Sequence, residues 1–211
     1  MNERKSVKWL KFSLSLAIGI FVSACTTPGV KTLEPGQRVE LPGISIGIPQ
    51  QDGWVYTHDV DGNDHYLSFF RRGSSSTYTF VTNVQVARMP PDALADGMPD
   101  HQEFLNGIKE NCWTSGPRFA VVEDSHTLES RFADLCVRSD STANDKQAVN
   151  KGDAGFLILK AKEYSFVIEP EDQSPPLFVH IGYTERGKEQ EIGSDFDLRA
   201  EQFFAAVDVT R

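Results

Sequence analysis

The sequence has 211 residues, of which 39% are hydrophobic and 24% are charged, and its formal net charge is −9 at pH 7. It contains no internal repeat and no long low-complexity segment, and its length suits one globular domain with one sizeable core. The strong negative charge disfavours binding to nucleic acid and to bare anionic lipid surfaces. If the protein has a macromolecular partner, a basic or neutral surface on that partner fits this charge best.

A short apolar segment at residues 12–24 follows a basic start that contains Arg4, Lys5, Lys8 and Lys11. As a helix these 13 residues would cover about 20 Å, less than the roughly 30 Å of a membrane's hydrocarbon core. A basic start, a short apolar middle and small residues at the end are typical of a secretory signal. The signal has a net charge of +3, so its removal from a chain of −9 leaves a polypeptide of −12.

The end of this segment, Val22-Ser23-Ala24-Cys25, resembles the lipobox of bacterial lipoproteins. In that family the cysteine sulfur receives a diacylglyceryl group, the signal is cut before the cysteine, and the new amino group is acylated. The resemblance implies that residues 1–24 are a cleaved signal peptide and that acyl chains such as palmitate on Cys25 hold the protein in the membrane. An ordinary signal with a chance cysteine, or an uncleaved anchor, is the alternative.

The residue after Cys25 indicates where the protein is sorted. In the lipoprotein family an Asp at that position tends to retain the protein at the inner membrane, whereas this sequence has Thr26. The resemblance therefore implies the outer membrane, with the domain facing the periplasm, and the inner membrane or the cell surface is the alternative. Residues 26–42 contain three prolines and no sustained periodicity. They predict a flexible tether after Cys25, followed by a single domain over residues 43–211.

Two cysteines, Cys112 and Cys136, remain once Cys25 is assigned to lipid. An even pair in an oxidising compartment predicts a disulfide, which would close a loop of about 25 residues. A redox-active pair is not favoured, because the spacing is not Cys-x-x-Cys. One conflict stands in the strand pattern, since Leu135 and Val137 share one predicted face and Cys136 lies on the other.

The predicted strands follow one another closely along the domain. Ile44, Ile46 and Ile48 alternate with small residues, which predicts a half-buried strand. Two predicted strands, at residues 54–59 and 66–72, flank a turn cluster and predict a β-hairpin. Further strands are expected at residues 78–89, 119–123, 133–138, 155–169 and 177–183.

Two amphipathic helices are predicted. The first follows Asp100, a plausible N-cap with Glu103 three residues on, and its apolar face would include Cys112. The second is expected at about residues 195–207, with Ser194 as its cap and an apolar stripe along one side.

These elements predict an α+β fold in which an antiparallel sheet of about six to eight strands carries the two helices on its surface. The element order weakly resembles the PsbP-like domain, an antiparallel sheet flanked by helices. A β-sandwich or a lipocalin-like barrel is the alternative, although the helix at about residues 100–112 interrupts the strands, which fits a barrel less well.

The densest cluster of potential metal ligands lies in the predicted hairpin, where His58, Asp61 and His65 could hold a transition metal across the two strands. A polar turn is the commoner explanation of such a cluster, so we expect no metal and no cofactor. The sequence contains no Gly-x-Ser-x-Gly motif and no clear pairing of a nucleophile with a base.

The sequence therefore predicts a lipid-anchored, non-catalytic envelope lipoprotein that serves as a binding or assembly factor, held to the membrane through Cys25 and facing an envelope protein partner. A small-molecule-binding lipoprotein is one alternative. A periplasmic hydrolase is another, less favoured because no catalytic motif stands out.

Overall fold

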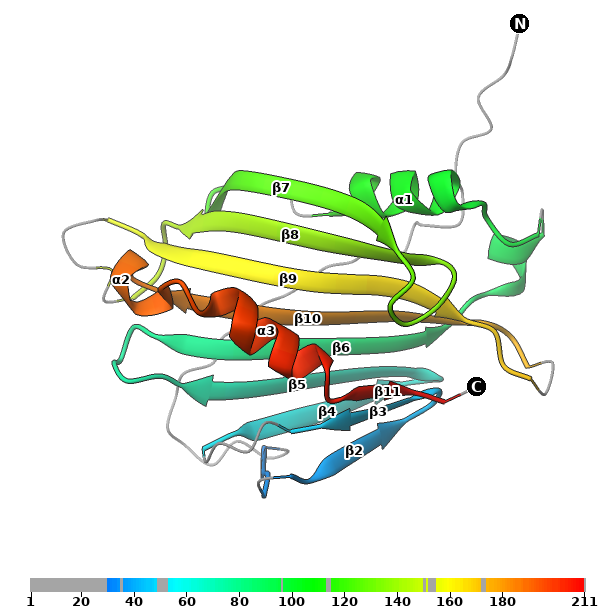
Figure 1. Ribbon diagram of the computed structural model, residues 1–211, viewed down its shortest axis with the longest axis horizontal. Helices are drawn as coiled ribbons and strands as arrows, with labels where there is room; N and C mark the ends of the chain where they lie inside the picture. Colours follow the sequence, from blue (N-terminus) through cyan, green and yellow to red (C-terminus); the bar gives the residue numbers. More distant parts are fainter. Residues whose placement is uncertain are drawn as a thin grey trace, which may run out of the picture.

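The computed structural model describes residues 30–34, 36–48, 53–95, 97–112, 115–149, 151, 155–171 and 174–210. Its main feature is an open, eight-stranded antiparallel sheet with β1 and β7 at its two edges (Figure 1). In spatial order its strands are β1 (Lys31–Thr32), β4 (Val55–Asp61), β5 (Asp64–Arg72), β6 (Thr79–Arg88), β10 (Leu177–Gly187), β9 (Leu157–Ile168), β8 (Cys136–Asp145) and β7 (Phe119–Glu129).

A small three-stranded sheet and four short helices complete the described fold. The small sheet has the order β11 (Val207–Val209), β3 (Ile44–Gly47) and β2 (Arg38–Leu41). The helices are η2 (Pro91–Leu94), α1 (His101–Glu110), α2 (Glu189–Ile192) and α3 (Phe196–Phe204). The predicted antiparallel sheet with helices packed on it is confirmed, and the sheet is open rather than closed into a lipocalin-like barrel.

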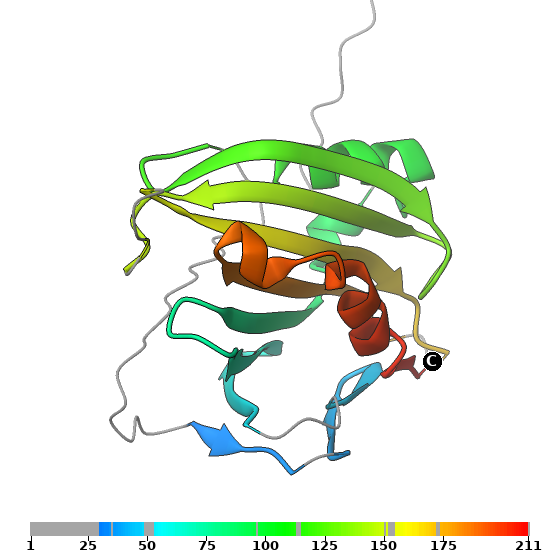
Figure 2. The same ribbon diagram turned by 60° about the vertical axis from the view of Figure 1, so that its left-hand side comes forward.

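The two faces of the large sheet are covered by different elements. Helix α3 and the small sheet lie on one face, whereas α1 packs on the opposite face near β7 and β8 (Figures 1 and 2). No helix among the described residues is both long and apolar enough to cross a membrane.

The main hydrophobic core fills the space between the large sheet, α3 and the small sheet. Phe132, Tyr164 and Phe204 form an aromatic cluster at its centre, with the Tyr164 and Phe204 ring centroids 4.8 Å apart in an edge-on arrangement. Such contacts add to the free energy of burial, which dominates the stability of a domain of this size.

A second, smaller core lies under α1. Helix α1 contributes Phe104, Leu105 and Ile108, which pack against Val137, Phe178 and other residues of the sheet. The capping box predicted for this helix is confirmed: the Asp100 carboxylate accepts a hydrogen bond from the Glu103 backbone N–H, and the Glu103 carboxylate accepts one from the Asp100 backbone N–H.

The structure corrects the boundary between tether and domain. The tether predicted for residues 25–42 is wrong from residue 31 on, because β1 and β2 lie there and Leu33 and Leu41 are buried in the main core. Two isolated leucines show no periodicity, so their burial was not visible in the local pattern. Residues 25–29, including Cys25, lie outside the described residues.

The predicted C-terminal helix is also shorter than expected. It ends at Phe204, and Val207 instead begins β11, whose register pairs Val207 with Ile46 of β3. The predicted cap residue Ser194 precedes the actual N-cap residue, Asp195, whose side chain makes no capping hydrogen bond.

Truncating Phe204 tests the main core. Phe204→Ala removes a side chain that is 1% exposed, and we expect the free energy of unfolding to fall by about 3–5 kcal/mol. The matched control is Leu198→Ala on the same helix, where the leucine is 61% exposed and the change should stay within about 0.5 kcal/mol. Urea denaturation followed by circular dichroism measures both, and equal losses would contradict this assignment of the core.

Candidate functional site

The most chemically distinctive cluster in the described residues lies where the end of α1 meets the edge strand β7. Asp124 and His126 are two residues apart on β7, so their side chains project from the same face of the sheet. Helix α1 packs on that face and ends at Glu110, which places Cys112 beside the two β7 side chains. Three side chains that can ligate a metal therefore meet.

Their donor atoms converge on a small volume. The Cys112 Sγ lies 3.2 Å from the His126 Nε2 and 3.6 Å from the Asp124 Oδ2, and that Nε2 and Oδ2 are 2.9 Å apart. All three atoms lie within 4.8 Å of one another. The His126 imidazole is only 6% exposed, whereas the Asp124 carboxylate, at 28%, still reaches solvent.

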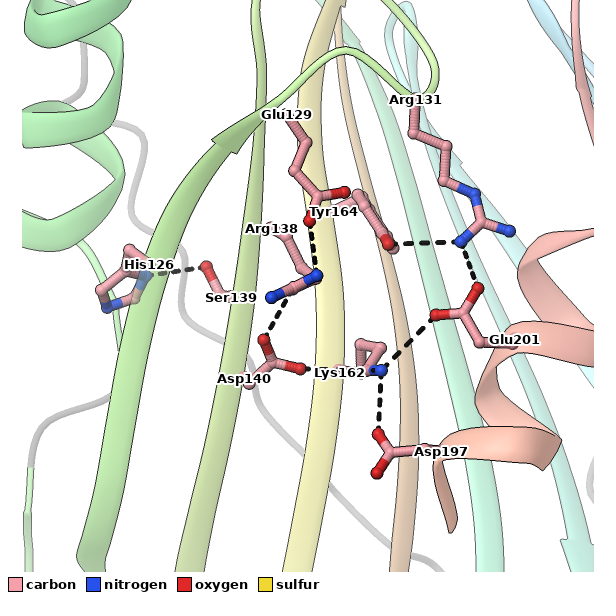
Figure 3. Close-up of polar contacts among 10 residues, drawn as sticks. All are labelled: His126, Glu129, Arg131, Arg138, Ser139, Asp140, Lys162, Tyr164, Asp197 and Glu201. Atoms are coloured by element: carbon pink, nitrogen blue, oxygen red, sulfur yellow. Dashed lines mark hydrogen bonds and ion pairs between the residues drawn. The ribbon is translucent and has the colours of Figure 1, made fainter. Parts of the chain in front are cut away.

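A serine on the neighbouring strand orients the His126 ring. The His126 Nδ1 is 2.8 Å from the Ser139 Oγ, and the two residues are register partners on β7 and β8 (Figure 3). When the Ser139 oxygen accepts the Nδ1 proton, the Nε2 lone pair is directed at Cys112 and Asp124. In the other tautomer the hydroxyl donates to Nδ1, and the protonated Nε2 donates to the Asp124 carboxylate.

This geometry does not suit a nucleophilic cysteine. Burial, together with the charge and hydrogen-bond acceptance of Asp124, raises the pKa of the Cys112 thiol to about 12. An activated cysteine needs a lowered pKa. Here the Asp124 carboxylate also competes with the thiol for the Nε2 of His126. A thiolate, an imidazole and a carboxylate around one point are instead a donor set for zinc-like ions.

The line of polar side chains continues onto β9. Glu163 is the register partner of Ser139 and lies opposite Gly182 on β10, so its side chain shares the face of His126. Gly182 leaves room for it, since a Cβ atom there would lie 3.3 Å from the Glu163 Cγ. Although Glu163 keeps some contact with solvent, burial of its carboxylate and repulsion by Asp124 raise its pKa to about 7.

A buried histidine lies in the next row. His180 on β10 is 4% exposed, and its Nδ1 is 3.0 Å from the Ser165 Oγ. Its Nε2 has no hydrogen-bond partner among the described residues. Burial alone lowers the pKa of His180 to about 4, so the ring is neutral at pH 7.

The predicted Cys112–Cys136 disulfide is not present: both cysteines are free thiols in the described structure. Cys136 is fully buried in the main core with α3, whereas its neighbour Val137 packs under α1 on the other face. Cys112 lies at the α1 face, so the sheet separates the two sulfur atoms. The alternation of Leu135, Cys136 and Val137 in the sequence contained this conflict.

The predicted hairpin cluster is brought together only in part. His58 and His65 meet across β4 and β5, with the Nε2 and Nδ1 atoms 3.2 Å apart and the rings stacked. Asp61 is an odd number of residues from His58 on the same strand, so it projects from the opposite face. Among the described residues these three side chains do not form a metal-ligating group.

A network of charged side chains on the opposite face has a structural role (Figure 3). Lys162 on β9 is 2.8 Å from Asp197 and 3.4 Å from Glu201, both on α3, and Arg131 binds Tyr164 and Glu201. Each charge faces an opposite charge, so these pairs hold α3 against the sheet rather than present a reactive group.

No family model and no curated protein matches this chain.

Glu163 and His180 give opposite pH dependences of stability. The unfolded chain protonates His180 near 6.5 and the folded protein only near 4, so the stability from its neutral ring is present above pH 6.5 and is lost as pH falls towards 4. The folded protein keeps the Glu163 proton up to about pH 7, whereas the unfolded chain loses it near 4.5. The Glu163 contribution therefore declines as pH rises through the same window.

The two contributions should offset each other in the wild type between pH 5 and pH 7. In Glu163→Gln only His180 remains, and we expect the free energy of unfolding to rise by about 2 kcal/mol from pH 5 to pH 7; in His180→Gln it should fall by about the same amount. Urea titrations in the presence of a chelator measure both slopes. Equal slopes in the two variants would show that these groups do not titrate as described.

Proposed function

We propose that this chain is a lipid-anchored lipoprotein of the bacterial outer membrane, and that its periplasmic domain is a non-catalytic binding or assembly factor. The observation that carries the proposal is the sequence Val22-Ser23-Ala24-Cys25, placed at the end of a short apolar segment with a basic start. Acyl chains on Cys25 would anchor the protein firmly, because two or more chains bind a bilayer far more strongly than one.

The topology supports a domain with one edge near the membrane and the other away from it. Only residues 26–30 separate Cys25 from β1, and fully extended they span at most about 18 Å. Strand β1 forms one edge of the large sheet and β7 forms the other. Seven strand spacings between them amount to at most about 34 Å. In an orientation with the sheet upright on the membrane, the β7 edge would lie on the membrane-distal side.

The β7 edge has the features of a protein-binding surface. This strand pairs with β8 on one side, and no described strand pairs with its other side. Ser115 covers its first part by accepting the Val121 backbone N–H, so the open part begins at about residue 122. Open strand edges recruit partners by strand addition. Exposed Val122 and the acidic Glu123 and Asp124 fit a partner with a basic or neutral surface.

Lipidation is tested by metabolic labelling with palmitate in a bacterium that expresses the full chain. We expect label in the wild type and in Cys112→Ala, and none in Cys25→Ala, because Cys25 is the cysteine that stands directly after the signal peptide. Intact mass should show a mature chain that begins at Cys25 and carries the added acyl groups. Label in Cys25→Ala, or a mature chain without lipid, would refute the anchor.

The binding edge is tested by photo-cross-linking in intact cells. A photoreactive side chain at Ser125 or Thr127 on β7 should yield a defined cross-linked protein. The same group at Val60, which is 57% exposed and lies on β4 near the opposite edge, is the matched control and should not. The same partner from all three positions, or none from β7, would argue against strand addition at this edge.

A further inference from the structure

The geometry points to a transition-metal site formed by Cys112, Asp124 and His126, which takes a divalent ion of the zinc class and leaves a fourth position for water. This site does not depend on the lipid anchor, but it shares Asp124 with the partner-binding edge proposed above. Its ligands would be the Cys112 Sγ, the Asp124 Oδ2 and the His126 Nε2.

The distances between the donor atoms fit a tetrahedral ion. With bonds of about 2.0–2.1 Å to nitrogen and oxygen and about 2.3 Å to sulfur, the ligand atoms of a tetrahedron lie about 3.3–3.6 Å apart. The three separations here are 2.9, 3.2 and 3.6 Å. Outward shifts of a few tenths of an ångström at Asp124 and Cys112 therefore suffice to admit the ion.

Without an ion, the three groups have hydrogen-bond partners of their own. The Cys112 thiol donates to the Lys109 carbonyl oxygen at 3.2 Å, and a protonated His126 Nε2 donates to the Asp124 carboxylate at 2.9 Å. A metal ion would replace both protons and satisfy all three groups from one point. The thiolate and the carboxylate together carry two negative charges, which a divalent ion neutralises.

The surroundings supply what a metal site requires. The Ser139 hydroxyl binds the far nitrogen of His126, the outer contact that orients histidine ligands in metalloproteins. The partial exposure of Asp124 leaves one side open, so that water can complete the coordination. The ion would tie the chain just after α1 to the edge strand β7, in addition to the packing of α1 on the sheet.

Cobalt and zinc binding to the full-length lipidated protein in detergent tests the site. Treated with a chelator and titrated with Co²⁺, the wild type should show a thiolate-to-cobalt charge-transfer absorption that one equivalent of Zn²⁺ removes. This signature requires no variant, so it does not depend on whether a substituted protein folds. Absence of the thiolate band, or binding of zinc without displacement of cobalt, would overturn the proposal.

Variants then identify the ligands. Cys112→Ser should lose the thiolate band, and His126→Gln should lose the stoichiometric zinc. Ser139→Ala should keep the band but bind zinc about 10- to 100-fold more weakly. The matched control is His58→Gln, in the other histidine pair, which should bind zinc as the wild type does. Loss of zinc in His58→Gln, or full affinity in Cys112→Ser, would place the metal elsewhere and refute this site.

Discussion

The structure depends on one constraint: where α1 covers the large sheet, the central strands have a core on each face, so successive residues there must suit one core or the other. On β9, Phe166 enters the main core and its neighbour Val167 enters the core under α1. The same alternation holds at Cys136 and Val137 on β8. Because successive side chains of a strand point to opposite faces, a shift of one residue would exchange the two sets completely.

This constraint also determines where polar groups can be placed. Under α1 the apolar core occupies only one end of the face, and the row that follows carries His126, Ser139 and Glu163 in register across three strands. On the α3 face the polar groups are paired instead. Glu185, which is fully buried, accepts two hydrogen bonds from the Arg199 guanidinium at 2.7 and 2.8 Å. Breaking such a pair leaves an uncompensated charge, so it specifies how α3 docks.

Much of the fold could be predicted from local sequence, because local features determine it. The hairpin of β4 and β5 follows from two strand-like segments around a turn cluster, and α1 follows from Asp100, Glu103 and its apolar spacing. The small sheet could not be predicted in the same way. Strand β3 is a short alternating run that pairs on one side with its sequence neighbour β2, but its other partner, β11, comes from a distant part of the chain. Long-range pairing of this kind leaves little local pattern.

The candidate site shows the same division. Asp124 and His126 lie beyond the strand predicted at residues 119–123, which in the structure continues to Glu129, and His126 stands alone as a histidine in the sequence. The sequence predicts a disulfide for Cys112, the side chain that meets His126 in the structure, because two cysteines remain once Cys25 is assigned to lipid. The helix that carries Cys112 packs on the α1 face, whereas the strand pattern already directed Cys136 to the other. The register was the stronger evidence, because it rests on the burial of several side chains rather than on a count of thiols.

The edge strand β7 combines features that act against one another. An exposed strand edge invites unspecific pairing, and the bulge between Val121 and Glu123, together with the acidic side chains that follow, protects against it. An ion held by Asp124 and His126 would remove one of these negative charges and fix the strand against α1. The edge would then be both more rigid and less acidic with metal than without. Such coupling needs no movement elsewhere in the fold, because the ligands and the edge belong to the same eleven-residue strand.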